Sequence, residues 1–273
     1  MCILTKYGAC LTMKLNAQQI AFFDVFGYLV LPKVFNEEEI TAMSKDFEAL
    51  ALADRDGKEF DADRRQNISV TETESWHDIE VRDQLFYPLV QLFGSDSFVS
   101  MGKPGGGLYV GDTDWHPDCA FVGTQKRIKG AIYLDTVTKD TGCLRIVPGS
   151  HKNPLHDQLQ PLRMGRIKKS LDDGSLMSNI APAGEKGRLE LEQWQEYSGI
   201  NMEDGTTIYG VDSLDIPAAN MESKPGDVVF FDQHCFHAAF GGKDGRRMVA
   251  MSWASNPTEP GHVEGVNVLD MRK

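Results

Sequence analysis

The sequence has few cysteines, and they lack the spacings of a disulfide framework or a structural metal site. Its five cysteines form neither an even set nor a Cys-x-x-Cys pair, and they are Cys2, Cys10, Cys119, Cys143 and Cys235. This argues against disulfide-rich secreted domains and closed zinc sites, because both need paired or closely spaced cysteines. Free thiols are typical of a reducing compartment, so we expect a cytoplasmic protein.

Long apolar runs and an excess of positive charge are also missing. No stretch approaches the about 20 apolar residues that a membrane-spanning helix requires, and residues 1–19 lack the basic start of a secretory signal. The chain has 28 Lys and Arg against 40 Asp and Glu, a formal net charge of -12. Such a chain repels nucleic-acid phosphates and anionic lipids. We therefore expect no nucleic acid and no membrane partner, but a small-molecule substrate.

The N-terminal part of the sequence has helix signals. Asn16 and Asn36 are each followed three residues later by Gln or Glu, which is the chemistry of a capping box. We expect helices over about 16–26 and, after Asn36, through EEEITAMSKDFEALAL, with YLVLPKVF between them as a short strand. The polar residues 53–75 predict a loop.

From about residue 98 the pattern changes to short runs rich in β-branched and aromatic residues. These runs are FVSMG, GLYVG, AFVG, KGAIYLDTV, GCLRIVPGS, DVVFFDQH and RMVAMSWAS. Short strands without intervening helices predict a sandwich or barrel rather than a parallel α/β sheet. We predict a single domain over 1–273, with an N-terminal helical region at about 15–52, a β core at about 98–255 and a lid-like insertion at about 152–224.

A histidine and an acid lie close together in the segment DTDWHPDCAF. His116 and Asp118 are two residues apart, so on a strand their side chains would project from the same face. An imidazole and a carboxylate form two thirds of the facial triad that suits Fe(II). The missing histidine is expected from a distant strand, and His237 in KPGDVVFFDQHCFHAAFGG lies where the chain would re-enter a sheet.

Other residues near this motif allow different interpretations. His234 is the alternative ligand to His237 because both lie in QHCFH. Cys119 and Cys235 adjoin the candidate ligands, but neither has the paired spacing of structural zinc sites, so we expect buried thiols. His156 and His262 have polar neighbours in the sequence and are predicted to be surface residues.

Four segments, which together cover about residues 15–254, resemble the phytanoyl-CoA dioxygenase family of Fe(II)- and 2-oxoglutarate-dependent oxygenases. They are FFDVFGYLVLPKVFNEEEI, WHPD, DTGCLRIVPGSHK, and KPGDVVFFDQHCFHAAF followed by DGRRMVAMSW. The resemblance implies an all-β core with flanking helices, folded as a double-stranded β-helix (jelly roll, cupin-like). It also implies that His116, Asp118 and His237 are the catalytic iron ligands, with 2-oxoglutarate and O2 as cosubstrates.

The same resemblance implies residues for 2-oxoglutarate. Arg246, the first arginine of RRMV, would bind the distal carboxylate, and Arg247 stays open as the alternative. The family often has a hydroxyl residue two positions after the distal histidine, where this chain has Ala239. Another donor must replace it, and Tyr109 and Tyr133 are the candidates.

The implied reaction is hydroxylation of an unactivated C–H bond of a small molecule, with release of succinate and CO2. Asp118 favours this outcome over halogenation, because halogenating relatives have a small residue at that place. Desaturation, cyclisation and epimerisation begin with the same oxidant and stay open. A non-catalytic jelly-roll protein that binds a metal or ligand is the alternative from another class.

One basic cluster, PLRMGRIKKS at 161–170, stands out in the acidic chain. It is either a solvated face or part of a lid. As a lid, Arg163, Arg166, Lys168 or Lys169 would meet an anionic substrate.

Overall fold

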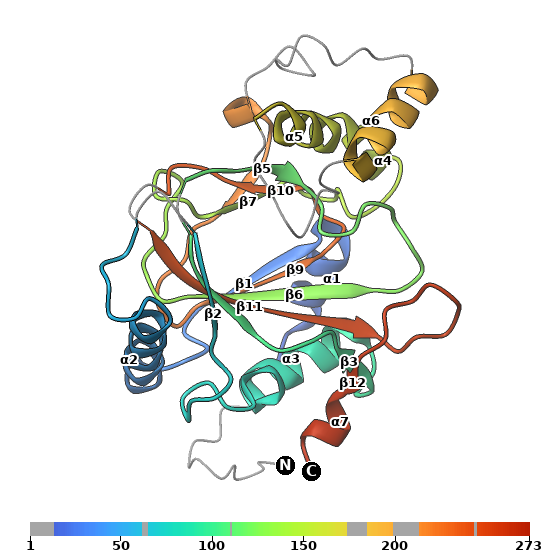
Figure 1. Ribbon diagram of the computed structural model, residues 1–273. Helices are drawn as coiled ribbons and strands as arrows, with labels where there is room; N and C mark the ends of the chain where they lie inside the picture. Colours follow the sequence, from blue (N-terminus) through green and yellow to red (C-terminus); the bar gives the residue numbers. More distant parts are fainter. Residues whose placement is uncertain (1–13, 62–64, 110, 174–184, 199–212, 243–244) are drawn as a thin grey trace.

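Two antiparallel sheets face each other, and helices cover the outer face of each (Figure 1). The computed structural model describes residues 14–61, 65–109, 111–173, 185–198, 213–242 and 245–273. The two antiparallel sheets and their outer helices confirm the predicted all-β core with flanking helices, folded as a double-stranded β-helix. The N-terminal stretch through residue 13 and the side chains of Lys168 and Lys169 lie outside the described residues.

The larger sheet has eight strands, in the order β1-β9-β6-β11-β3-β12, with β4 paired to both β11 and β2. Its strands are β1 Tyr28–Leu31, β2 Gln66–Ser69, β3 Phe98–Ser100, β4 Gly105–Tyr109, β6 Arg127–Tyr133, β9 Val228–Asp232, β11 Arg246–Ser255 and β12 Val266–Asn267. The smaller sheet has the order β5-β10-β7-β8. Its strands are β5 Thr113–His116, β7 Leu144–Ile146, β8 Ala219–Met221 and β10 His237–Ala239.

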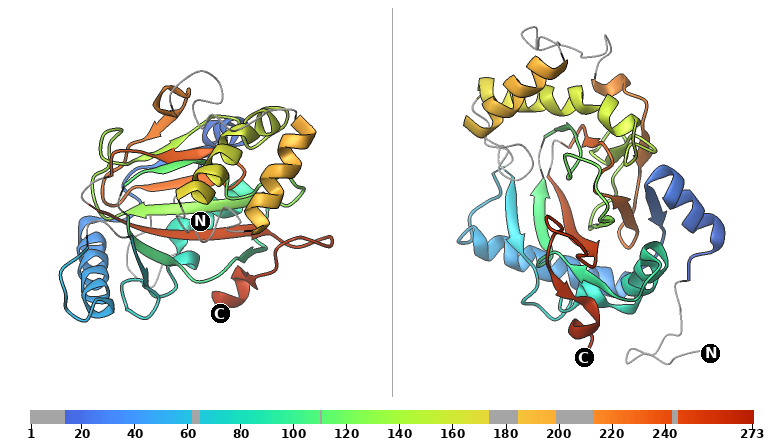
Figure 2. Two further views of the ribbon diagram at one scale, coloured as in Figure 1. Left: turned by 45° about the horizontal axis from the view of Figure 1, so that its top comes forward. Right: turned by 90° about the vertical axis from the view of Figure 1, so that its right-hand side faces the viewer.

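The helices lie outside the two sheets, with α5 and α6 on one side and α2 and α3 on the other (Figure 2). They are α1 Ala17–Phe26, α2 Glu37–Asp54, α3 Asp83–Phe93, α4 Leu155–Gln158, α5 Gln160–Asp173, α6 Glu185–Ser198 and α7 Val268–Met271, with short 3₁₀ turns at Ile79–Val81 and Ser213–Asp215. Within the interval 152–224, the described residues form α4, α5 and α6 and also β8, which pairs with β7. No described helix combines the length and apolar character needed to cross a membrane.

Both N-terminal helices begin where the capping chemistry predicts. The Asn16 side chain accepts the Gln19 backbone N–H at 2.9 Å, and the Gln19 side chain accepts the Asn16 N–H at 2.9 Å. Asn36 and Glu39 make the same reciprocal pair at 3.0 and 2.8 Å. Each box satisfies two backbone donors that the first helical turn leaves open.

Strand β9 shows how the sequence builds two apolar layers. Side chains alternate along a strand, so Val228 and Phe230 join the core outside the larger sheet, whereas Val229 and Phe231 join the core between the sheets. A strand that is buried on both faces reads as the continuous apolar run VVFF.

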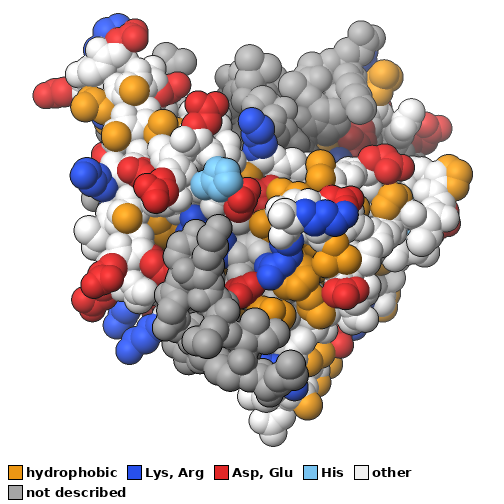
Figure 3. Space-filling model, turned by 90° about the horizontal axis from the view of Figure 1, so that it is seen from below, with side chains coloured by type: hydrophobic (Ala, Val, Ile, Leu, Met, Phe, Trp, Pro, Cys, Tyr) orange, Lys and Arg blue, Asp and Glu red, His pale blue; other side chains and the backbone are white. Residues whose placement is uncertain are grey.

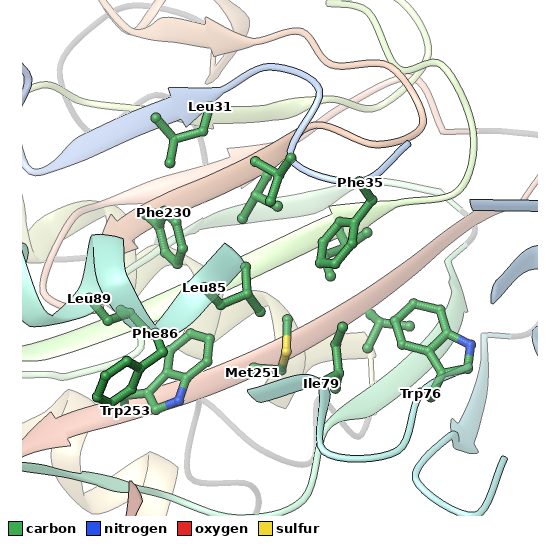
Figure 4. Close-up of a cluster of buried hydrophobic side chains, with 14 of the residues drawn as sticks. Leu31, Phe35, Trp76, Ile79, Leu85, Phe86, Leu89, Phe230, Met251 and Trp253 are labelled. Atoms are coloured by element: carbon green, nitrogen blue, oxygen red, sulfur yellow. The ribbon is translucent and has the colours of Figure 1, made fainter. Parts of the chain in front are cut away.

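The outer core of the larger sheet is dominated by aromatic and aliphatic side chains under α3. Phe230 and Trp253 come from strands and lie near Leu85 and Leu89 of α3 (Figure 4). The face opposite α5 and α6 presents interspersed acidic and basic side chains to solvent (Figure 3).

Two sequence expectations about local structure are wrong. The loop expected at 53–75 contains β2, which gains its order by pairing with β4. The segment AFVG, residues 120–123, forms no strand, and its Phe121 is 73% exposed. Helix α3 lies in a region for which the pattern predicted no element.

Candidate metal centre

The two histidines expected to bind a metal are direct partners on neighbouring strands. His116 ends β5, His237 begins β10, and the register of the two antiparallel strands pairs them. Their neighbours Trp115 and Phe236 belong to the core outside the smaller sheet. Alternation therefore turns both imidazoles to the opposite face, toward the space between the sheets. Their ring centroids lie 4.3 Å apart.

Asp118 completes the group, although β5 ends before it. The Asp118 Oδ1 atom lies 4.0 Å from His116 Nε2 and 3.8 Å from His237 Nε2. Among the described residues, these three form the group of metal-ligating side chains whose donor atoms lie within 4.8 Å of one another. His116, Asp118 and His237 therefore lie together, as the sequence predicted.

The backbone fixes which nitrogen of each histidine faces the centre. His116 Nδ1 lies 2.7 Å from the Asp114 carbonyl oxygen, and His237 Nδ1 lies 2.9 Å from the Cys235 carbonyl oxygen. A carbonyl can only accept, so each Nδ1 carries the proton and donates. Both Nε2 atoms then present lone pairs, which is the tautomer that a metal needs.

Lys129 holds one oxygen of Asp118 and leaves the other open. Its Nζ atom donates to Asp118 Oδ2 at 2.8 Å. Asp118 Oδ1 is buried and makes no hydrogen bond to a described residue. A buried carboxylate oxygen without a donor is costly unless a cation binds it. The donor set of two imidazoles and one oriented carboxylate fits a divalent transition metal with open coordination positions.

The ionisation states also suit metal binding. Burial lowers the pKa of His237, and burial together with His237 lowers the pKa of His116 well below its ordinary value. Burial raises the pKa of Asp118, but the charge and hydrogen bond of Lys129 together with the charges of His237 and Arg166 outweigh it, and the net pKa is lowered. At neutral pH the site therefore holds neutral imidazoles and an ionised carboxylate, the forms that bind metals.

The lysine was missed by the sequence analysis, although a signal for it existed. Alternation along β6 turns Ala131 and Tyr133 into the space between the sheets, and Lys129 has the same parity. A lysine at an inward position of an apolar strand requires a buried partner.

Lys129→Met is expected to weaken metal binding by roughly 10–100-fold, which is typical of losing a residue that orients a ligand. Without the Nζ donor, Asp118 can rotate away from the two histidines. Fe(II) or Zn(II) affinity, measured by competition with a chelator, checks this. Lys139→Met is the control, since Lys139 is exposed and contacts Asp140. Equal metal affinity in Lys129→Met and wild type would show that Lys129 does not position Asp118.

The remaining histidines are held elsewhere. The His234 Nδ1 atom lies 2.7 Å from Asp232 Oδ1. Burial disfavours a charged imidazole here, but the hydrogen bond to Asp232 raises the pKa of His234 to about 9. His262 contacts Glu259 at 3.0 Å. The surface position predicted for His156 is wrong, because its ring is fully buried and lies 3.0 Å from each of the Ala120 and His234 carbonyl oxygens.

The two cysteines beside the ligands are buried, as expected for thiols outside the metal site. Cys119 Sγ lies 3.7 Å from Gln233 Oε1, and Cys235 Sγ lies 3.5 Å from the Gly27 carbonyl oxygen. Both are free cysteines, and neither joins the metal-ligating group.

Arg246 and Arg247 begin β11 and have different surroundings. Arg247 donates to Asp135, with a shortest separation of 2.6 Å, and to Glu48 at 2.8 Å. Arg246 is only 6% exposed, and its Nη1 atom donates to the Gly111 carbonyl oxygen at 3.4 Å. The alternation of β11 therefore ties one arginine to surface carboxylates and buries the other.

Two tyrosines and two glycines surround the Arg246 guanidinium. Tyr109 is its register partner on β4, with the ring centroid 5.8 Å from the guanidinium carbon. Tyr133 interacts electrostatically with Arg246, and burial raises the pKa of Tyr133. A Cβ atom at Gly142 would lie 2.6 Å from Arg246 Nη1, and one at Gly242 would overlap it. The missing side chains leave the space that the guanidinium fills.

The chain is a double-stranded β-helix with two imidazoles and one carboxylate between its sheets. This combination is typical of proteins that bind a single metal ion. Within that class, the chain belongs to the phytanoyl-CoA dioxygenase (PhyH) family, whose family model matches residues 23–248. No curated protein matches the sequence.

Solved structures with this fold share little sequence with the chain. EvdO2 from Micromonospora carbonacea var. aurantiaca, complexed with 2-oxoglutarate, is 15% identical, with a TM-score of 0.58 over 93% of this chain and 96% of that one. The carbocyclase SnoK from nogalamycin biosynthesis is 18% identical, with a TM-score of 0.56 over 91% and 87%. The epimerase SnoN, in complex with Fe3+, alpha ketoglutarate and nogalamycin RO, is 15% identical, with a TM-score of 0.55 over 91% and 93%. At these identities the likeness concerns the fold.

Proposed function

We propose that the protein is an Fe(II)- and 2-oxoglutarate-dependent dioxygenase that hydroxylates an unactivated C–H bond of a small molecule. The observation that carries the proposal is the group of His116, Asp118 and His237, whose two Nε2 atoms and one open carboxylate oxygen lie within 4.8 Å of one another. A protein that only binds a ligand needs no open coordination position. Membership of the PhyH family supports the same function.

Each residue of the site has a distinct task in this function. His116, His237 and Asp118 would hold the iron, and Lys129 keeps the carboxylate oriented. Iron supplies the activation of O2, which side chains alone cannot provide. Phe231, whose ring centroid lies 4.9 Å from that of His237, would help to exclude water from the reacting groups.

Arg246 would bind the distal carboxylate of 2-oxoglutarate. Its planar guanidinium can bond a carboxylate through two parallel N–H donors. Tyr109 and Tyr133 flank this group and would supply the hydroxyl donor that Ala239 lacks. The engagement of Arg247 with Asp135 and Glu48 supports Arg246 in this role.

Gly242→Ala is expected to weaken 2-oxoglutarate binding by roughly 10–100-fold, because the new methyl group displaces the Arg246 guanidinium and overpacking costs about 1–3 kcal/mol. The obstructing atom is the far end of a flexible side chain, so the fold should tolerate the change. Calorimetric titration of the metal-loaded protein with 2-oxoglutarate checks it. Gly123→Ala is the control, since a Cβ there meets no atom within 4 Å. An unchanged affinity for 2-oxoglutarate in Gly242→Ala would show that the space at Gly242 is not needed for cosubstrate binding.

Hydroxylation is the proposed outcome because Asp118 occupies the place that a halide would need. Cyclisation, desaturation and epimerisation are the alternatives, and similar folds carry the names carbocyclase and epimerase in SnoK and SnoN. Mass spectrometry of the product separates hydroxylation, which adds one oxygen atom, from epimerisation, which leaves the mass unchanged, and from desaturation or cyclisation, each of which removes two hydrogen atoms.

The proposal is tested on the wild-type protein in two steps. Anaerobic addition of Fe(II) and 2-oxoglutarate should produce the weak visible charge-transfer band of the iron chelate. Admission of O2 should then convert 2-oxoglutarate into succinate and CO2, slowly and without added substrate. Absence of both signals would refute the oxygenase function.

A further inference from the structure

Three side chains form a row across strands β2, β4 and β11 of the larger sheet. The register pairs Tyr109 of β4 with Arg246 of β11. Gln66 begins β2 and pairs with Leu108 of β4. Arg65, the residue before β2, therefore lies opposite Tyr109. Leu108 joins the core outside the larger sheet, so alternation turns the row toward the space between the sheets, where the metal ligands lie.

The Tyr109 ring is held between two guanidinium groups and its own strand. Arg65 Nη2 donates to Tyr109 Oη at 2.7 Å, and the Arg65 guanidinium carbon lies 3.9 Å from the ring centroid. The Arg246 guanidinium carbon lies 5.8 Å from the same centroid. A Cβ atom at Gly107 would lie 2.5 Å from Tyr109 Cε2, so the ring occupies space that glycine leaves open. These contacts keep the phenol beside Arg246.

The hydrogen bond from Arg65 decides how the Tyr109 hydroxyl can act. A guanidinium has N–H donors and no acceptor, so the phenolic oxygen accepts from Arg65. The hydroxyl proton cannot go to Arg65 and stays available for an acceptor beside Arg246. Hydrogen bonds in a chain polarise one another, so a donor to the phenolic oxygen strengthens the O–H group as a donor.

Tyr133, the other tyrosine beside Arg246, has different surroundings. It lies on β6 and pairs with Met248 of β11 rather than with Arg246. Burial raises the pKa of Tyr133, which makes its hydroxyl a weaker acid. Of the two tyrosines, Tyr109 is therefore the better placed and better polarised donor.

We propose that Arg65 is a positioning residue of the cosubstrate site. It directs the Tyr109 hydroxyl so that this group and the Arg246 guanidinium both donate to the distal carboxylate of 2-oxoglutarate. This inference deepens the proposed function and rests on it. A purely structural Arg65 would instead only fasten the start of β2 to β4, and its loss would affect all ligands of the site alike.

Zn(II)-loaded protein, which does not react with O2, is titrated by calorimetry with 2-oxoglutarate and with 2-oxopentanoate, in which a methyl group replaces the distal carboxylate. Arg65→Met is expected to raise the Kd for 2-oxoglutarate by roughly tenfold, the size of one hydrogen bond. The Kd for 2-oxopentanoate should not change. Tyr109→Phe should weaken 2-oxoglutarate binding at least as much. Adding Arg65→Met to Tyr109→Phe should weaken it no further, because Arg65 then has no hydroxyl to direct.

Arg55→Met is the matched control, because Arg55 contacts β2 from the opposite face, where its Nη1 atom donates to the Gln66 side chain at 2.9 Å. Its loss should leave both affinities unchanged. Equal weakening of both keto acids by Arg65→Met, an unchanged Kd for 2-oxoglutarate, or the same loss with and without the Tyr109 hydroxyl overturns the role of Arg65 alone. Failure of the wild type to bind Zn(II) or 2-oxoglutarate contradicts the proposed function itself.

Discussion

His237→Ala is expected to abolish the charge-transfer band and succinate formation, and to weaken Fe(II) binding by more than about 100-fold. Losing a residue that merely supports a ligand costs roughly 10–100-fold, and His237 would donate directly to the metal. Its removal leaves one imidazole and one carboxylate, with the Lys129 charge close to Asp118. Anaerobic titration of the variant with Fe(II) in the presence of 2-oxoglutarate measures the effect.

Two further histidine variants make this result specific. His77→Ala removes an imidazole that is exposed and pairs with Asp78, so its band should equal that of the wild type. His234→Gln tests the neighbouring histidine, whose ring lies against Asp232, and it should retain Fe(II). If a folded His234→Gln variant loses the band while His237→Ala retains it, His234 is the ligand and the assignment is wrong.

Arg246→Met is expected to raise the Kd for 2-oxoglutarate by at least roughly thirtyfold, with metal affinity unchanged. Truncating one partner of a buried charge pair costs about 2–5 kcal/mol. The methionine fills the volume beside Gly142 and Gly242, so the loss reports the missing guanidinium rather than a cavity. Calorimetric titration of the Zn(II)-loaded variant with 2-oxoglutarate measures it.

Arg247→Met supplies the matched comparison on the next residue of the same strand. Its side chain is bound to Asp135 and Glu48, so the variant should bind 2-oxoglutarate normally. It should unfold at a lower temperature, because Asp135 loses its partner. A larger loss of affinity in Arg247→Met than in Arg246→Met would exchange the roles of the two arginines.

The N-terminal helices could be predicted from their capping residues, whereas elements that depend on contacts with distant residues could not. Asn16 and Asn36 carry their capping partners within three residues, so sequence alone contains the signal. Strand β2 has only one buried residue, Ile68, and is ordered by pairing with β4. The segment AFVG is apolar, yet Phe121 is exposed, and the carbonyl of the preceding Ala120 is bound by His156 and Gln160 instead of by a neighbouring strand. The residues that pair with β2 or bind the Ala120 carbonyl lie dozens of residues away in the chain. They therefore leave no periodic pattern in the local sequence.

The grouping of His116, Asp118 and His237 could be predicted because the order and types of these residues are specific, but the residues around them could not. His156 has three carbonyl oxygens within 3.1 Å, and they come from separate segments. The polar neighbours of His156 in the sequence therefore predicted a surface residue, whereas the folded chain buries it. The different surroundings of Arg246 and Arg247 likewise depend on the position of Asp135, which lies 111 residues before Arg246 in the chain and binds Arg247.

The pairing of His116 with His237 makes the metal site depend on strand alignment. Trp115 and Phe236 pack outside the smaller sheet, each one residue before a ligand. A slip of β10 by one residue would turn Phe236 toward the metal and His237 toward α5. The full burial of Phe236 in the core outside the smaller sheet opposes such a slip. The apolar contacts under α4 and α5 thus help to fix the register of β5 and β10, and with it the positions of His116 and His237 on the other face of the sheet.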